Sequence, residues 1–177
     1  RRLWYDETDL LWVNPSPNLR SVTQATLYPG VGSIENTNLS VGRGTEAPFE
    51  SVGAPWIDGI RLAGVLNARH LDGVRFYPIE FIPDRGRYAG ELCFGVGITV
   101  IDRNVIRPVR VGVEIATALF RLYPNEFDLD SAVRLVGSRA TIRRIQLGVD
   151  PADIALDWTA GERQWRERIA PHLLYEP

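Results

Sequence analysis

Leu92-Cys93-Phe94-Gly95-Val96-Gly97-Ile98-Thr99-Val100-Ile101 is a run in which bulky apolar residues alternate with small ones. Because successive side chains of a β-strand point to opposite faces, this pattern predicts a strand with one bulky face and one small face. The bulky face is expected to lie beneath helices. The small face, which includes Gly95 and Gly97, would let another backbone or a ligand approach closely.

The segments around this strand indicate the fold class. Before it, the sequence predicts a helix from Asp58 to about Arg69 and a strand over Val74–Phe81 that Pro78 interrupts. After Arg107, apolar residues recur at helical spacing, and the last predicted helix has Trp165 facing inward. Strands in the middle followed by helices predict an α+β fold, in which helices pack on one side of a small, mainly antiparallel sheet.

The first residues of the chain differ from the rest. Leu3–Tyr5 and Leu10–Val13 are short apolar runs, and the first reads as part of a strand that is already under way. A helix over Leu19–Leu27 is expected next, with Asn18 as its cap and Tyr28-Pro29-Gly30 as its end. The chain starts without Met, and we expect it to be a fragment of a longer protein.

Composition excludes several classes of function. The 177 residues carry a net charge of −2, which gives no general attraction to nucleic acid, and no apolar run is long enough to span a bilayer. Cys93 is the only cysteine, so an internal disulfide and a cysteine metal cluster are both excluded. His70 and His172 stand alone. We therefore expect no metal site and no cofactor.

The polar segment Glu35–Glu50 contains the candidate binding residues. Its Gly42-Arg43-Gly44 triplet places a guanidinium on permissive backbone, and a planar guanidinium suits a carboxylate or a phosphate. Asn38, Ser40 and Thr45 add the amide and hydroxyl groups that a sugar or sugar-acid site requires. No Gly-Lys-Ser/Thr follows, so a phosphate-binding loop is not indicated. The alternative interpretation is a solvated turn.

Two further residues near this segment are candidates for chemistry. Glu35 directly precedes the amide-rich run and is the candidate acid–base group, although a loop cap or a surface ion pair is the alternative for any single glutamate. Tyr28 stands between a predicted helix and a Pro-Gly break, where its ring would face a cleft and stack on a sugar. Ser40 has no histidine partner at a suggestive spacing, so a catalytic triad is not indicated.

Several motifs together resemble one known family. They are Trp12-Val13-Asn14-Pro15-Ser16-Pro17-Asn18, Tyr28-Pro29-Gly30, the run from Glu35 to Thr45, Pro48-Phe49-Glu50, Gly53-Ala54-Pro55-Trp56, Tyr88-Ala89-Gly90-Glu91-Leu92-Cys93-Phe94-Gly95-Val96 and Leu173-Leu174-Tyr175. In this order they resemble the DUF1343 family, which is associated with NamZ-type exo-β-N-acetylmuramidases. The chain departs from that family at Val41, where a glutamate is usual.

The resemblance implies a bacterial hydrolase of cell-wall recycling that removes non-reducing-end N-acetylmuramic acid from peptidoglycan fragments. Such proteins pair a Rossmann-like catalytic domain with a smaller carboxyl-terminal domain, and they are exported to the periplasm or secreted. Residues 1–27 would then be the last strand of the Rossmann-like domain and a connection, and residues 28–177 the carboxyl-terminal α+β domain. The main catalytic residues would lie in the missing domain, so this chain alone would be inactive.

The resemblance also implies roles for the polar segment. Arg43 would bind the lactyl carboxylate of the amino sugar, while Tyr28, Asn38, Ser40 and Thr45 would contact its other groups. Glu35 would orient them or assist protonation. A non-catalytic module that braces a partner domain is the alternative. An acyl- or phosphoryl-transfer enzyme is a third possibility, for which the sequence offers neither a nucleophile–base pair nor a phosphate loop.

Overall fold

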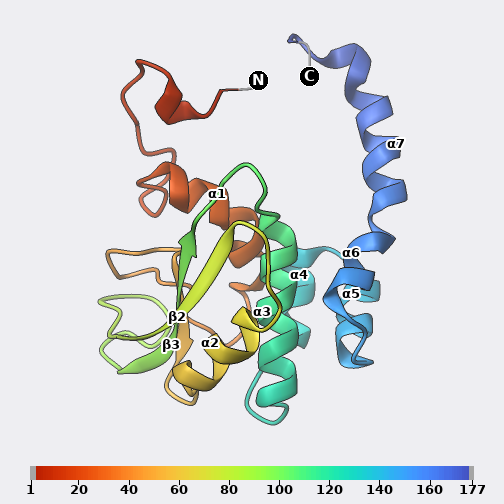
Figure 1. Ribbon diagram of the computed structural model, residues 1–177. Coiled ribbons are helices and arrows are strands. Elements are labelled where there is room, and N and C mark those ends of the chain that lie inside the picture. The colour runs from red at the N-terminus through yellow and green to blue at the C-terminus, as the bar shows by residue number, and fades with distance from the viewer. Residues whose placement is uncertain (1–2, 176–177) are drawn as a thin grey trace.

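The strand predicted at Leu92–Ile101 is the central strand of a three-stranded antiparallel sheet (Figure 1). The computed structural model describes residues 3–175, and the strand order is β1-β3-β2. The strands are β1 (Ser51–Ala54), β2 (Val74–Phe81) and β3 (Cys93–Val100). Pro78 does not interrupt β2, because β2 is an edge strand with a neighbour on one side only.

Helices account for most of the remaining regular structure. They are α1 (Val22–Val31), α2 (Gly59–Asn67), α3 (Pro108–Leu122), α4 (Val133–Val136), α5 (Arg139–Gln146), α6 (Pro151–Asp157) and α7 (Thr159–Ile169). In Figure 1, α3 to α6 lie to the right of the strands, and the loops 35–50 (orange) and 82–92 (light green) extend to the left. Through Asn38, the loop 35–50 also contacts the segment between α3 and α4. The predicted α+β class is therefore confirmed.

The two faces of β3 differ as the sequence predicts. Val96 and Ile98 are buried in the core, and α2 packs against β2 and β3. On the small face, a Cβ at Gly95 would lie 2.0 Å from the carbonyl oxygen of Val52, and one at Gly97 would lie 2.3 Å from the ring of Tyr77. The glycines thus let the neighbouring strand and an aromatic ring approach, as the small face allows.

A buried carboxylate in the middle of α3 connects this helix, through Arg69, to the end of α2 and the start of α6. Glu114, in α3, is 2% exposed and lies 2.9 Å from Nε of Arg69, which follows α2, and 3.3 Å from Nη2 of Arg110. Arg69 also contacts Asp150, the N-cap of α6, at 2.6 Å. This hydrogen bond holds the pKa of Asp150 below its usual range. The network thus ties α2, α3 and α6 together.

The amino-terminal segment differs from the prediction. Residues 3–50 form no β-strand, and Tyr5–Glu7 is a turn of 3₁₀-helix instead of the expected strand. Within residues 3–175, this exposed apolar run has no strand to pair with. Leu11, for example, is 87% exposed.

Helix α1 also differs from its predicted bounds. It begins after Ser21, whose hydroxyl accepts from the backbone N–H of Gln24 at 3.1 Å, and it continues through Pro29 to Val31. Proline costs one hydrogen bond, but Leu27 and Val31 on either side of it are fully buried, so packing outweighs the loss. The predicted division between residues 27 and 28 falls inside this helix.

The last helix contradicts the prediction that Trp165 faces inward. Trp165 is 59% exposed, and α7 has no buried residue. Figure 1 shows α7 (blue) leaving the body of the molecule. An apolar side chain on a helix is buried only where another element covers it, and nothing in residues 3–175 covers this one. Within residues 3–175, each helix is too short or too polar to cross a membrane.

Candidate functional site

The polar segment Glu35–Glu50 is an ordered loop fastened to the sheet. Ser40 exchanges two backbone hydrogen bonds of 2.9 Å with Gly53 of β1, and the N–H of Phe49 donates to the carbonyl of Val41 at 2.8 Å. The backbone conformation explains the two glycines of the Gly-Arg-Gly triplet, because Gly42 and Gly44 have φ values of 77° and 81°. These values favour glycine. The glycines therefore set the direction of the residue between them, Arg43.

Arg43 forms a two-pronged ion pair with Glu35 across this loop. Nη2 donates to Oε2 of Glu35 at 2.9 Å, and Nε donates to Oε1. The guanidinium carbon lies 5.0 Å from the centre of the ring of Phe49, so the cation also stacks on a buried aromatic face. Both partners are partly exposed, with 36% of the Arg43 side chain and 28% of the Glu35 side chain accessible. The pair is held in one orientation at the surface.

This ion pair lies in the wall of a polar cavity of about 440 Å³. Three segments that are distant in the sequence line the cavity: the loop after α1, the loop between β2 and β3, and the start of α4. Its lining residues are Glu35, Asn36, Leu39, Ser40, Val41, Arg43, Gly86, Arg87, Ser131 and Arg134. The structure thus brings together Glu35, Ser40 and Arg43 from the predicted set.

The other predicted residues lie near this cavity without lining it. Asn38 uses its whole amide to hold a loop, since Nδ2 donates to the carbonyl of Glu126 at 2.6 Å and Oδ1 accepts from the N–H of Asp128 at 2.8 Å. Thr45 donates its hydroxyl to the carbonyl of Gly42 at 2.7 Å. Tyr28 is 44% exposed and packs edge-on against Phe49. Their contact with a substrate stays a prediction.

Ser40 is a special case within the predicted set. It lines the cavity but is only 3% exposed, and its Oγ accepts from the N–H of Gly42 at 3.3 Å. Its hydroxyl therefore first serves the turn that presents Arg43.

Four residues of the cavity lie outside the polar segment and were missed by sequence reasoning, namely Gly86, Arg87, Ser131 and Arg134. Arg87 is in the loop between β2 and β3, and Arg134 is in α4, more than forty residues further along the chain. No spacing rule connects two such positions. Only the packing of α4 against the segment that follows α1 places Arg134 beside Glu35.

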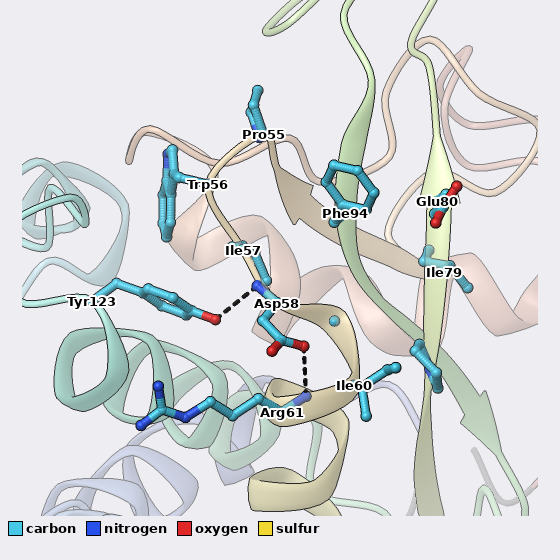
Figure 2. Close-up of a pocket in the computed structure, with 12 residues that line it drawn as sticks. Pro55, Trp56, Ile57, Asp58, Ile60, Arg61, Ile79, Glu80, Phe94 and Tyr123 are labelled. Carbon is cyan, nitrogen blue, oxygen red and sulfur yellow. Dashed lines mark hydrogen bonds between the residues drawn. The ribbon is translucent and has the colours of Figure 1, made fainter.

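A second cavity, of about 660 Å³, lies between the start of α2 and the ends of β2 and β3, and it is mainly apolar (Figure 2). Figure 2 shows Trp56, Phe94 and Tyr123 around it. The hydroxyl of Tyr123 accepts from the N–H of Asp58 at 2.8 Å, and the Asp58 carboxylate accepts from the N–H of Arg61 at 3.0 Å. Its polar groups therefore fix the start of α2.

A chain of hydrogen bonds connects residues beside the two cavities. Nε1 of Trp56 donates to the hydroxyl of Tyr88 at 3.3 Å, and that hydroxyl donates to the carbonyl of Asn38 at 2.9 Å. Trp56 lines the apolar cavity, while Leu39 and Arg87, the neighbours of Asn38 and Tyr88, line the polar one. This chain of bonds holds the loop between β2 and β3 against the polar loop.

No group of three or more His, Cys, Asp or Glu side chains comes together at metal-binding range in residues 3–175. The ionisable groups that line the polar cavity are three guanidinium groups and one carboxylate. Guanidinium groups bind carboxylates and phosphates. The fold and this cavity thus define a small α+β domain with a surface cavity suited to an anionic ligand.

The chain belongs to the family described as Exo-beta-N-acetylmuramidase NamZ, C-terminal, whose model matches residues 26–175. It is 35% identical over 178 residues to the Peptidoglycan beta-N-acetylmuramidase NamZ of Bacillus subtilis (strain 168), and the match covers 99% of this chain and 43% of that protein. The resemblance predicted from the motifs is confirmed.

Solved structures agree with this assignment. The chain is similar to the crystal structure of a DUF1343 family protein from Bacteroides fragilis NCTC 9343, with 25% identity and a TM-score of 0.88 over 99% of this chain and 48% of that one. A second DUF1343 family protein from the same organism shares the fold, with 22% identity and a TM-score of 0.64 over 92% of this chain and 44% of the other. The chain spans less than half the length of each of these relatives.

Proposed function

We propose that this chain is part of a glycoside hydrolase that removes non-reducing-end N-acetylmuramic acid from peptidoglycan fragments. In this proposal it supplies one wall of the substrate cleft. The name of the Bacillus subtilis relative, a peptidoglycan β-N-acetylmuramidase, supports the activity. The observation that carries the proposal is the Glu35–Arg43 pair in the wall of an arginine-rich cavity, in a chain of this family. N-acetylmuramic acid is a sugar with a carboxylate, so it matches both the polar and the positive character of that cavity.

The residues have different parts in this proposal. Glu35 lies at the cavity surface and orients the sugar or assists protonation, and Arg43 fixes the position of Glu35 through two hydrogen bonds. Direct binding of the lactyl carboxylate by Arg43, which the sequence predicts, would use its Nη1 or displace Glu35. Tyr28, Asn38, Ser40 and Thr45 would support or contact the remaining groups of the sugar.

The second wall of the cleft would come from an amino-terminal Rossmann-like domain of the same native protein. The chain covers 43% of its Bacillus subtilis relative, which leaves room for another domain. Exposed apolar residues at the start of this chain, Leu10, Leu11 and Val13, offer a surface for it. The isolated chain is therefore proposed to be inactive. By family resemblance, the whole protein works in the periplasm or outside the cell in cell-wall recycling.

Hydrolysis of a chromogenic N-acetylmuramide by the full-length protein tests this function. We expect Arg43→Ala to lower kcat/KM by at least about tenfold, because a lost charge-assisted hydrogen bond costs about 1.5–3 kcal/mol. Arg85→Ala is the matched control, since Arg85 is an exposed arginine of the neighbouring loop that pairs with Asp84 outside the cavity. Equal kcat/KM in wild type and Arg43→Ala would contradict the role of the ion pair, and no turnover by the wild type would contradict the function.

The alternative is a non-catalytic module whose polar loop only braces a partner domain. One observation favours it: the side chains of Asn38, Ser40 and Thr45 all form hydrogen bonds within this chain. Titration of the chain with N-acetylmuramic acid, followed by tryptophan fluorescence, separates the two. Saturable binding that Arg43→Ala abolishes supports a ligand cleft, and an unchanged signal supports the brace.

A further inference from the structure

The polar cavity carries more positive charge than its ion pair requires. Its titratable lining residues are one carboxylate, Glu35, and three guanidinium groups, those of Arg43, Arg87 and Arg134. Glu35 and Arg43 compensate each other through two hydrogen bonds. One negative and three positive charges therefore leave two positive charges on the remaining arginines.

Neither of these two arginines has a hydrogen bond or an ion pair within residues 3–175. Asp84 and Asp128, two acidic residues of the adjoining segments, have partners of their own. Asp84 pairs with Arg85 at 3.8 Å, and Asp128 accepts from the hydroxyl of Ser131 at 2.5 Å. Both arginines are exposed residues whose like charges line one cavity, so an anion that binds between them is attracted by both.

The backbone that carries Arg87 is held in place. The N–H of Asp84 donates to the carbonyl of Gly44 at 2.8 Å, the N–H of Gly90 donates to that of Pro83 at 2.9 Å, and the ring of Tyr88 is tied to Asn38. Arg134 is in α4, which packs against the 3₁₀ turn Gly32–Ile34 directly before Glu35. Both arginines thus belong to segments that are held in place, and this lowers the cost of binding an anion.

We propose that Arg87 and Arg134 bind the carboxylate of the ligand and determine the preference of this site for an acidic sugar. Arg43 is then a positioning residue, which keeps Glu35 in place and does not contact the acid group. The inference uses the proposed function only to choose the ligand, an N-acetylated sugar with a lactyl carboxylate. A carboxylate between Arg87 and Arg134 accepts from both guanidinium groups, the geometry in which arginine recognises such ions.

The test compares two chromogenic substrates that differ only in charge, the N-acetylmuramide and its lactyl methyl ester, with the full-length protein. The wild type prefers the acid. Arg87→Gln and Arg134→Gln each lower that preference by about tenfold, through KM, and the double variant treats both substrates alike. Arg43→Gln lowers turnover of the two substrates by the same factor and leaves the preference unchanged. Arg85→Gln, outside the cavity, changes neither quantity.

Two outcomes of this comparison overturn the inference. One is an unchanged preference for the acid in the Arg87→Gln/Arg134→Gln double variant. The other is loss of the preference in Arg43→Gln, because that result would show that Arg43 binds the carboxylate of the ligand.

A binding measurement separates failure of this inference from failure of the proposed function. If the full-length protein hydrolyses neither substrate, the 177-residue chain is titrated with free N-acetylmuramic acid and with its methyl ester, and the arginine Nε–Hε signals are followed by NMR. The inference is supported, even in the absence of activity, if the signals of Arg87 and Arg134 shift with the acid but not with the ester and if added salt weakens this binding. Shifts confined to Arg43, or no shifts at millimolar acid, overturn it.

Discussion

At the scale of single residues, Arg43 shows how a side chain depends on its neighbours for its role. Its place between two glycines marks it as a candidate binding residue, and the positive φ of Gly42 and Gly44 explains the two glycines. Its partner is Glu35, eight positions away, which the sequence identifies separately as a candidate acid–base group. Two residues that were considered for different tasks thus form one unit, because the loop folds back on itself.

Cys93 gives a prediction at the same scale. Cys93 is the first residue of β3 and is fully buried, and burial, with a contribution from Glu91, raises the pKa of its thiol to about 11. Since the thiolate is the reactive form, we expect Ellman's reagent at pH 8 to leave the folded chain unlabelled for hours and to label one thiol per chain in concentrated guanidinium chloride. Rapid labelling of the folded chain would show that the strand opens or that the thiol is accessible.

At the scale of elements, the crossing of α1 and α3 depends on two glycines. A Cβ at Gly112 would lie 2.3 Å from the carbonyl oxygen of Gly30, and one at Gly30 would lie 1.8 Å from the carbonyl oxygen of Pro108. The two helix backbones therefore touch. This contact, together with the burial of Leu27 and Val31, explains why α1 continues through Pro29.

Gly112→Ala tests this crossing. We expect it to lower the free energy of unfolding by about 1–3 kcal/mol, because the helices must separate to admit a methyl group. Gly64→Ala is the matched control: Gly64 is in α2, is exposed, and would have nothing within 4 Å of its new Cβ. Alanine there should raise stability by about 0.5–1 kcal/mol. Urea unfolding followed by tryptophan fluorescence measures both, and equal effects of the two substitutions would contradict the tight crossing.

At the scale of the whole molecule, stability resides in the sheet and in α1 to α6, whereas α7 contributes little. No residue of α7 is buried, while Ile154 of the preceding helix α6 is fully buried. We expect a chain that ends at Trp158 to lose less than about 1 kcal/mol of its free energy of unfolding, since surface groups outside the core contribute little.

Ile154→Ala is the comparison for this truncation. It removes a fully buried side chain without shortening the chain, and we expect it to cost about 2–5 kcal/mol. Denaturant unfolding of both variants decides the point. A truncation as costly as Ile154→Ala would place α7 in the cooperative core of this chain.

The fold could be predicted where the signal is local. The alternation in Leu92–Ile101 predicted the central strand. Asp58 predicted the start of α2, where its carboxylate accepts from the N–H of Arg61, and Pro108 predicted the start of α3. The polar composition of residues 35–50 gave the loop and three of the residues that line the cavity, Glu35, Ser40 and Arg43. Each of these depends on side-chain periodicity or on a cap, which neighbouring residues set by themselves.

The sequence by itself therefore determined the α+β class, the family and the position of the polar loop. Only the tertiary structure decided that Arg43 is engaged by Glu35, that Arg87 and Arg134 join the same cavity, and that α7 and residues 3–13 lie outside the core. The physical reason is that these features depend on contacts between segments far apart in the chain. Such contacts follow from how whole elements pack, and the local propensity of a segment does not determine which distant residues it will contact.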